Sequence, residues 1–203
     1  SGGQKQKIAI GINFFTAITQ LVVSSILIIK RGLIAFQYYT MDSNIFAAIT
    51  SIFLIISLLT KKEVSERIHN FRYYSTCCVT LTFLVVITIL VPMDGWHTLP
   101  NRLFMGSDFW LHTVGPLLNI VSFIFFEREN TLSKKQPLLA IIPTIIYAIF
   151  AIIFNLLKVI DGPYFFLKIY EQPIWEVIMW LVIIGILVFI IAFLLKKATS
   201  TKK

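Results

Sequence analysis

Charged residues are scarce in this sequence. They make up only 14% of the 203 residues, whereas about a quarter is usual in soluble globular domains. The charges lie in clusters between long apolar runs, and the mean hydropathy is +0.83. This pattern excludes an ordinary soluble domain and indicates an integral membrane protein. The net charge of +8 follows from those clusters, so it predicts contact with membrane lipids and no nucleic-acid partner.

Cysteine is also rare. Cys77 and Cys78 are the two cysteines, and they are adjacent within an apolar run. Their spacing predicts neither a disulfide framework nor a metal site, so we expect two small buried side chains and no cofactor. The first apolar run is long and lacks a small-residue cleavage site, so no cleavable signal peptide is expected. The opening Ser1-Gly2-Gly3 is typical of a cloning remnant and is left out of the fold.

Long apolar runs dominate the rest of the chain. A membrane-spanning helix needs about 20 mostly apolar residues, and six stretches meet that length: Ile8–Ile29, Phe36–Leu59, Tyr74–Pro92, Ser107–Phe126, Leu138–Leu157 and Ile174–Leu195. No internal repeat separates them, and no room is left for a soluble domain. The sequence therefore predicts an all-α integral membrane protein, a six-transmembrane-helix bundle formed by one domain of residues 4–203.

The lysines and arginines of the connections predict the orientation, because they favour the cytoplasmic side. With six spans, both termini share a side with the second and fourth connections. That side carries thirteen basic residues: Lys5, Lys7, Lys61, Lys62, Arg67, Arg72, Arg128, Lys134, Lys135, Lys196, Lys197, Lys202 and Lys203. The other side carries five: Lys30, Arg31, Arg102, Lys158 and Lys168. We therefore expect a multi-pass protein of the cell membrane with both termini in the cytoplasm.

Two spans contain hydrogen-bonding residues near their predicted outer ends. The second span begins with the polar stretch "YYTMDSN", and the fourth contains "SDFWLHTVGPLLN". At about 1.5 Å per residue, Thr40 and His112 lie at nearly the same depth, roughly 6–8 Å inside. Taken alone, a threonine in a span usually bonds its own helix or a neighbouring one. An intramembrane histidine, by contrast, marks a functional site by default.

Helical spacing adds supporting groups to this pair. Asp108 lies four residues before His112, so its carboxylate is a candidate for orienting the imidazole. Asn44 shares a helix face with Thr40, and Asn119 shares one with His112. Pro116 has no N–H to donate to the carbonyl of His112, which predicts a kink and a free carbonyl. Tyr39 and Asp42 complete the polar start of the second span, which we expect to line a cavity instead of facing lipid.

These stretches resemble a known family. "YYTMDSN", "WLHTVGPLLNIVSFIFFE" and "DGPYFFLKIYEQ" are similar to segments of the androgen-induced gene one family of small multi-span membrane proteins. Its animal members are intramembrane threonine hydrolases that cleave fatty acid esters of hydroxy fatty acids. The threonine and the histidine–proline pair of that family are matched here by Thr40 and by His112 with Pro116. Ser43-Asn44 is more similar to the bacterial branch, whose substrates the resemblance does not fix.

The resemblance implies that Thr40 is a nucleophile and His112 its general base, acting on an acyl ester near the outer leaflet. A threonine hydroxyl becomes nucleophilic when a base takes its proton, and an imidazole, whose pKa is ordinarily about 6.5, can do so at neutral pH. Asn44, Tyr39 or a backbone N–H at the helix start are candidates for binding the oxyanion.

Two other functions stay open at this point. One is a non-enzymatic lipid-binding protein or small-molecule transporter, because intramembrane Asp and His also mark permeation paths. The other is a metal-dependent lipid hydrolase, because Asp94, His97, Asp108 and His112 are of metal-ligating types on the same side. The sequence fixes neither the natural substrate nor the oligomeric state.

Overall fold

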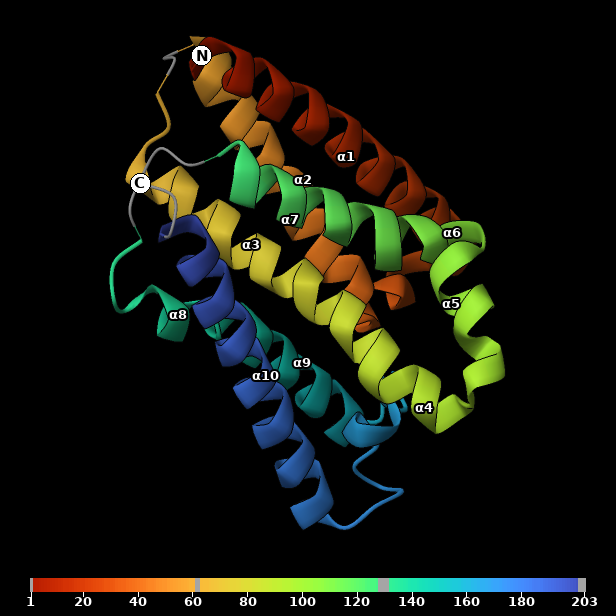
Figure 1. Ribbon diagram of the computed structural model, residues 1–203. Coiled ribbons are helices and arrows are strands. Elements are labelled where there is room, and N and C mark those ends of the chain that lie inside the picture. Colours follow the sequence, from red (N-terminus) through yellow and green to blue (C-terminus); the bar gives the residue numbers. More distant parts are fainter. Residues whose placement is uncertain (1, 61–62, 128–131, 201–203) are drawn as a thin grey trace.

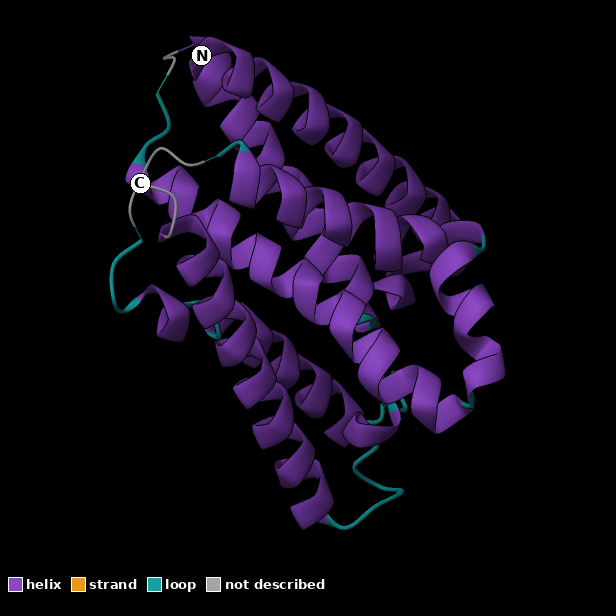
Figure 2. Cartoon of the chain, in the orientation of Figure 1, coloured by secondary structure: helices purple, strands orange, loops and turns teal. Residues whose placement is uncertain are grey.

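The protein is built from helices joined by short loops (Figures 1 and 2). The computed structural model describes residues 2–60, 63–127 and 132–200, and all regular structure within these residues is helical. The α-helices are α1 (Gly2–Arg31), α2 (Tyr39–Thr60), α3 (Glu66–Val85), α4 (Val91–Asp94), α5 (Leu99–Phe104), α6 (Gly106–Asp108), α7 (Gly115–Phe125), α8 (Gln136–Leu139), α9 (Ile142–Leu156) and α10 (Ile174–Ser200). The 3₁₀-helices are Gly32–Gln37, Trp96–Thr98 and Phe165–Leu167, and the π-helices are Val86–Leu90 and Phe109–Val114.

Six helical stretches are long and apolar enough to cross a membrane, as predicted. They are Gly2–Gln37, Tyr39–Thr60, Glu66–Asp94, Gly106–Phe125, Gln136–Leu156 and Ile174–Ser200. The chain passes back and forth, so the start of α1 and the end of α10 lie at the same end of the bundle (Figure 1). We call this the terminal end, and we call the opposite end, where α4, α5 and α6 lie, the distal end.

The bundle has two parts that meet at α3. In the first part, α1 packs against α2 and α7, and α3 packs against both α2 and α7. In the second part, α9 and α10 lie along the other side of α3 (Figure 1). The hydroxyl of Tyr73 on α3 donates a hydrogen bond to the Ala192 carbonyl of α10 at 2.5 Å. Cys77 and Cys78 are buried in the core with free thiols, as expected from the sequence.

The third span begins earlier than predicted. It was expected to begin at Tyr74, but α3 begins at Glu66 and carries Arg72 into the bundle, where this side chain is fully buried. Its Nε and Nη2 donate to the Glu127 carboxylate at 2.9 and 2.8 Å. Pairing with a carboxylate makes a buried guanidinium tolerable, so Arg72 belongs to the core and not to a connection.

Several basic residues used for the orientation lie outside the described residues: Lys61, Lys62, Arg128, Lys202 and Lys203. Ser1 also lies outside them, whereas Gly2 and Gly3 form the start of α1.

Candidate active site

His112 lies in a π-helical turn at the start of the fourth span. In this turn the Gly115 N–H bonds to the Trp110 carbonyl, five residues back instead of four. By the same spacing, the absent N–H of Pro116 would have bonded the Leu111 carbonyl. That carbonyl instead accepts a hydrogen bond from the Asn44 side chain of α2 at 2.9 Å. We predicted that the carbonyl of His112 would be left free by Pro116. The carbonyl that is left free, and that a neighbouring span bonds, is instead that of Leu111, one residue earlier.

The imidazole of His112 is held by the backbone. Its Nδ1 lies 2.7 Å from the Arg102 carbonyl, and a carbonyl only accepts, so Nδ1 carries the proton. The neighbouring Thr113 hydroxyl donates to the Leu103 carbonyl at 2.7 Å. These two contacts fasten α5 to the π-helical turn and leave the Nε2 lone pair of the neutral ring free to accept.

Asp108 does not make the orienting hydrogen bond that the sequence suggested. Its Oδ2 lies 3.9 Å from His112 Nδ1, beyond hydrogen-bond distance, and its side chain is 45% exposed. The reason is local: the Arg102 carbonyl already occupies Nδ1. Asp108 therefore lies near the imidazole, but the Arg102 carbonyl orients it.

Thr40 faces His112 from the first turn of α2. Its Oγ1 lies 3.2 Å from His112 Nε2, so the predicted contact between the second and fourth spans is confirmed. Other threonines in the spans, such as Thr76 and Thr80, bond the carbonyl four residues back in their own helix. Thr40 instead offers its hydroxyl to a neighbouring span. Because Nδ1 holds the ring proton, the Thr40 hydroxyl donates to Nε2.

Asn44 holds the two spans in register but does not line the site. It is fully buried, and its amide donates to the Thr40 carbonyl at 2.8 Å and to the Leu111 carbonyl at 2.9 Å. Its Oδ1 accepts from Gln20 of α1 at 2.9 Å. Both amide protons are thus used, so Asn44 is not an oxyanion donor. A Cβ on Gly115 would lie 2.7 Å from Asn44 Oδ1, which explains the glycine here.

Tyr39, Asp42 and Asn119 also point away from the pair. The Tyr39 hydroxyl bonds Thr144 of α9 at 2.8 Å. Asp42 lines a lateral groove between α2 and α9 of about 710 Å³. Asn119 accepts from Arg72 at 2.9 Å, deep in the first part of the bundle. From the sequence we also expected Asn44 and the Gly115-Pro116 kink to border the same cavity as Asp108. This prediction is wrong, because Asn44, Gly115 and Pro116 are buried in the contacts between helices.

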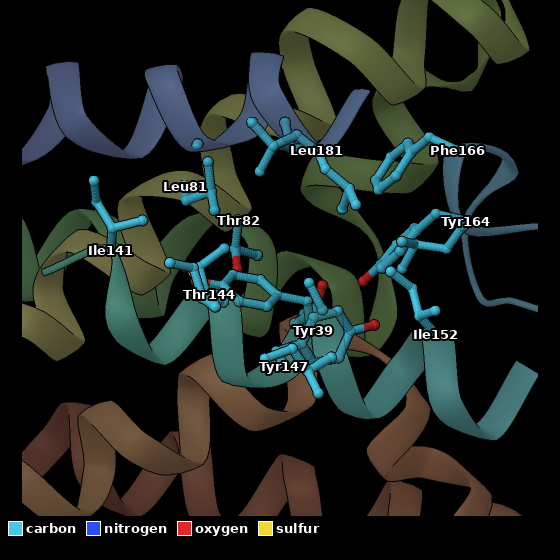
Figure 3. Close-up of a pocket in the computed structure, with 18 of the residues that line it drawn as sticks. Tyr39, Leu81, Thr82, Ile141, Thr144, Tyr147, Ile152, Tyr164, Phe166 and Leu181 are labelled. Carbon is cyan, nitrogen blue, oxygen red and sulfur yellow. The ribbon is translucent and has the colours of Figure 1, made fainter. Parts of the chain in front are cut away.

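Two cavities meet at Thr40. A polar chamber of about 400 Å³ opens at the distal end, and its walls include His112, Asp108, Arg102, Asp94 and Arg31. An apolar cavity of about 240 Å³ lies between α2, α3, α9 and α10 and is lined mainly by aliphatic and aromatic side chains (Figure 3). Thr40 and Tyr164 belong to the walls of both. The polar start of α2 therefore lines cavities, as expected.

Tyr164 is a site residue that sequence reasoning did not single out. It precedes the 3₁₀-helix Phe165–Leu167, and its hydroxyl points from this loop into the apolar cavity (Figure 3). There it lies close to the Thr40 side chain and to the backbone N–H groups of Tyr39 and Thr40. Burial raises the pKa of Tyr164 to about 12, so the phenol keeps its proton at neutral pH. The aromatic segment "GPYFFL" was the available signal, but aromatic residues at this depth usually serve as interface anchors.

The described residues contain no cluster of side chains that could hold the metal ion of the metal-dependent alternative. Across residues 2–60, 63–127 and 132–200, no three His, Cys, Asp or Glu side chains are grouped so that they could hold a metal ion. Of the four candidates, Asp94 is ion-paired with Arg102. The donor set of the metal-dependent alternative is thus not assembled among these described residues.

Comparison of the chain with protein-family models, with curated proteins and with solved structures gives no match.

Proposed function

We propose that this chain is an intramembrane lipid-ester hydrolase with Thr40 as nucleophile and His112 as general base. The observation that carries the proposal is the 3.2 Å contact between Thr40 Oγ1 and His112 Nε2. The Arg102 carbonyl, 2.7 Å from Nδ1, fixes the tautomer that can accept the hydroxyl proton. The resemblance of the same residues to the androgen-induced gene one family supports this chemistry.

The first half of the reaction forms an acyl-enzyme. The Thr40 hydroxyl gives its proton to His112 Nε2 while Oγ1 attacks the ester carbonyl carbon. The tetrahedral intermediate then collapses, the bond to the alcohol oxygen breaks, and Nε2 returns the proton to the leaving alcohol. The Arg102 carbonyl accepts from Nδ1 throughout and stabilises the imidazolium that forms in between.

The second half releases the acid. A water from the polar chamber gives one proton to His112 Nε2 and attacks the acyl carbonyl, after which Thr40 Oγ1 leaves and recovers that proton. In both halves negative charge develops on the carbonyl oxygen. The Tyr164 hydroxyl and the N–H of Thr40 lie beside Thr40 Oγ1, and the first N–H groups of a helix lack partners within it. These donors suit the oxyanion.

The proposal includes an orientation in the membrane. With Arg72 removed from the count of thirteen because it is buried in the core, twelve basic residues of the sequence remain on the predicted side of the termini against five on the other side. This bias supports a cell-membrane protein with both termini in the cytoplasm. The polar chamber then opens to the outer surface, where water reaches an ester whose chain lies in the bilayer.

Two alanine substitutions test the function. Thr40→Ala should reduce hydrolysis of a fluorogenic fatty-acyl ester to background, and His112→Ala should lower kcat/KM by about 10²–10⁴-fold, the usual contribution of a general base. Thr88→Ala is the control, because Thr88 only bonds its own helix at Leu84. A fluorophosphonate should label wild type and not Thr40→Ala. If wild type binds fatty-acyl chains but shows neither hydrolysis nor labelling, the protein is a non-enzymatic lipid binder and the proposal is wrong.

A further inference from the structure

The apolar cavity beside Thr40 offers an occupant almost no polar partner. The hydroxyl of Thr82 is bonded to Ser43 at 2.8 Å, that of Tyr39 to Thr144 at 2.8 Å, and that of Tyr147 to the Gln37 carbonyl at 2.5 Å. The hydroxyl groups of Thr40 and Tyr164 lie where this cavity meets the polar chamber. A hydrocarbon chain therefore fits the cavity, and the polar part of the same molecule has to lie at Thr40.

The position of His112 decides which half of an ester enters the cavity. His112 lines the polar chamber and is not part of the apolar cavity. In the proposed reaction it must protonate the leaving alcohol oxygen, so that oxygen has to lie on the chamber side of Thr40. The acyl chain, on the other side of the carbonyl carbon, then points into the apolar cavity.

We propose that the apolar cavity between α2, α3, α9 and α10 is the acyl-chain site, and that the substrate is a single-chain fatty acyl ester of a small polar alcohol. This inference rests on the proposed hydrolase function. The walls of the polar chamber carry Arg31, Asp94, Arg102 and Asp108, so the alcohol half is polar and not a second long chain. A monoacylglycerol has this chemistry.

The cavity volume sets a scale for the acyl chain. A cavity of about 150 Å³ accommodates the six carbons of benzene, so the 240 Å³ here corresponds to roughly ten carbons. Ile145 and Ile149 of α9 line the cavity and are 49% and 51% exposed, so this wall of the cavity is not closed off. A longer chain can therefore extend past α9 into the surrounding lipid.

Gly185 provides a direct test of this site. It lies on α10 in the wall of the cavity, and a Cβ built on it meets no atom within 4 Å. A larger side chain can thus enter the cavity without a backbone clash. Gly11 of α1 is the matched control, because it has the same open surroundings and is not part of the cavity wall.

The experiment measures kcat/KM on monoacylglycerols of increasing acyl length for purified wild type, Gly185→Leu and Gly11→Leu. For Gly185→Leu we expect the ratio of long-chain to short-chain activity to fall about tenfold, the discrimination usual for one or two methylenes. Gly11→Leu should keep the wild-type profile. If Gly185→Leu does not fold, as judged by gel filtration, Ala148→Ile in the same wall replaces it with the same expectation.

Three outcomes overturn parts of this account in distinguishable ways. If Gly185→Leu and Ala148→Ile both keep the wild-type acyl-length profile while hydrolysis still depends on Thr40, the acyl-chain site is disproved. The proposed hydrolase function is then unaffected. In a parallel series of esters with alcohols of increasing length, a change in Gly185→Leu confined to that series reverses the assignment of the two cavities. If no hydrolysis is observed, or if the observed hydrolysis is unchanged in Thr40→Ala, both the proposed hydrolase function and this inference are wrong.

Discussion

At the scale of single residues, Tyr164 gives the most specific prediction. Tyr164→Phe removes only the hydroxyl that contacts Thr40 and keeps the ring, which stacks on Phe166 with centroids 5.3 Å apart. Loss of one oxyanion donor costs about 10²–10³-fold in kcat elsewhere, so we expect kcat to fall about 100-fold and KM to change little. Tyr38→Phe, on a residue that also lines the polar chamber, is the control. A normal kcat in Tyr164→Phe would exclude this role.

The same residue predicts a pH dependence. Because the pKa of Tyr164 is raised to about 12, the phenol stays protonated and keeps donating between about pH 6 and pH 9. The ratio of wild-type to Tyr164→Phe activity should therefore be constant over this range. A ratio that falls toward pH 9 would mean that Tyr164 loses its proton in the working enzyme.

Asp108 is expected to matter less than His112. The imidazole is oriented by the Arg102 carbonyl at 2.7 Å, whereas Asp108 lies 3.9 Å from the same nitrogen. Asp108→Asn should thus lower kcat/KM less than about tenfold, as expected when a partly exposed charge is removed. Kinetics of the purified variant check this, and a loss as large as that of His112→Ala would show that the carboxylate takes part in the reaction.

At the scale of helices, the buried pair Arg72–Glu127 joins α3 to the end of α7. Burial alone would raise the pKa of Glu127, but the Arg72 guanidinium and hydrogen bonds from Arg72, Ser122 and Asn13 bring this pKa below its usual value. The pair therefore stabilises the fold above the unfolded pKa of about 4.3, and this contribution is lost as the pH falls through the lowered folded value.

Breaking this pair should be costly. Glu127→Ala leaves a buried guanidinium without its carboxylate, so we expect a loss of about 3–5 kcal/mol in unfolding free energy, measured by denaturant titration in detergent. Arg72→Met combined with Glu127→Leu should recover most of the loss, because no charge then remains buried. Glu66→Ala, an exposed carboxylate on α3, should be nearly neutral. Equal losses in the single and double variants would mean that the helix contact does not depend on the ion pair.

The helices also show how far the sequence determines the site. Apolar run length was enough to predict six spans. Matched depth permitted contact between Thr40 and His112, and the family resemblance then singled out this pair, whose side chains lie 3.2 Å apart. The sequence prediction assumed that residues four apart share a face of the helix, and this assumption does not reveal a π-helical turn. Such a turn rotates every later residue around the helix axis. For that reason Asn119, expected beside the site, lies in the Arg72 network. The Arg102 carbonyl and Tyr164 come from connections, whose geometry follows from packing and not from periodicity.

At the scale of the whole molecule, the polar chamber opens at the distal end, whereas the start of α1 and the end of α10 lie at the other end of the bundle (Figure 1). This separation makes the orientation testable independently of activity. Asn101 at the distal end and Ser200 at the terminal end are both exposed. Cys77 and Cys78 are 0% and 2% exposed, so the native thiols should contribute little background.

Single cysteines introduced at these two positions should therefore report opposite sides of the membrane. In intact cells, Asn101→Cys should react with a membrane-impermeant maleimide. Ser200→Cys should react only after the membrane is permeabilised, because the sequence carries its excess of lysine and arginine on the predicted side of the termini. Both variants should react equally in detergent, which controls for thiol reactivity. The reverse pattern would place the polar chamber in the cytoplasm. Thr40 and His112 would then receive their ester from the inner leaflet, while the geometry of the pair itself would be unaffected.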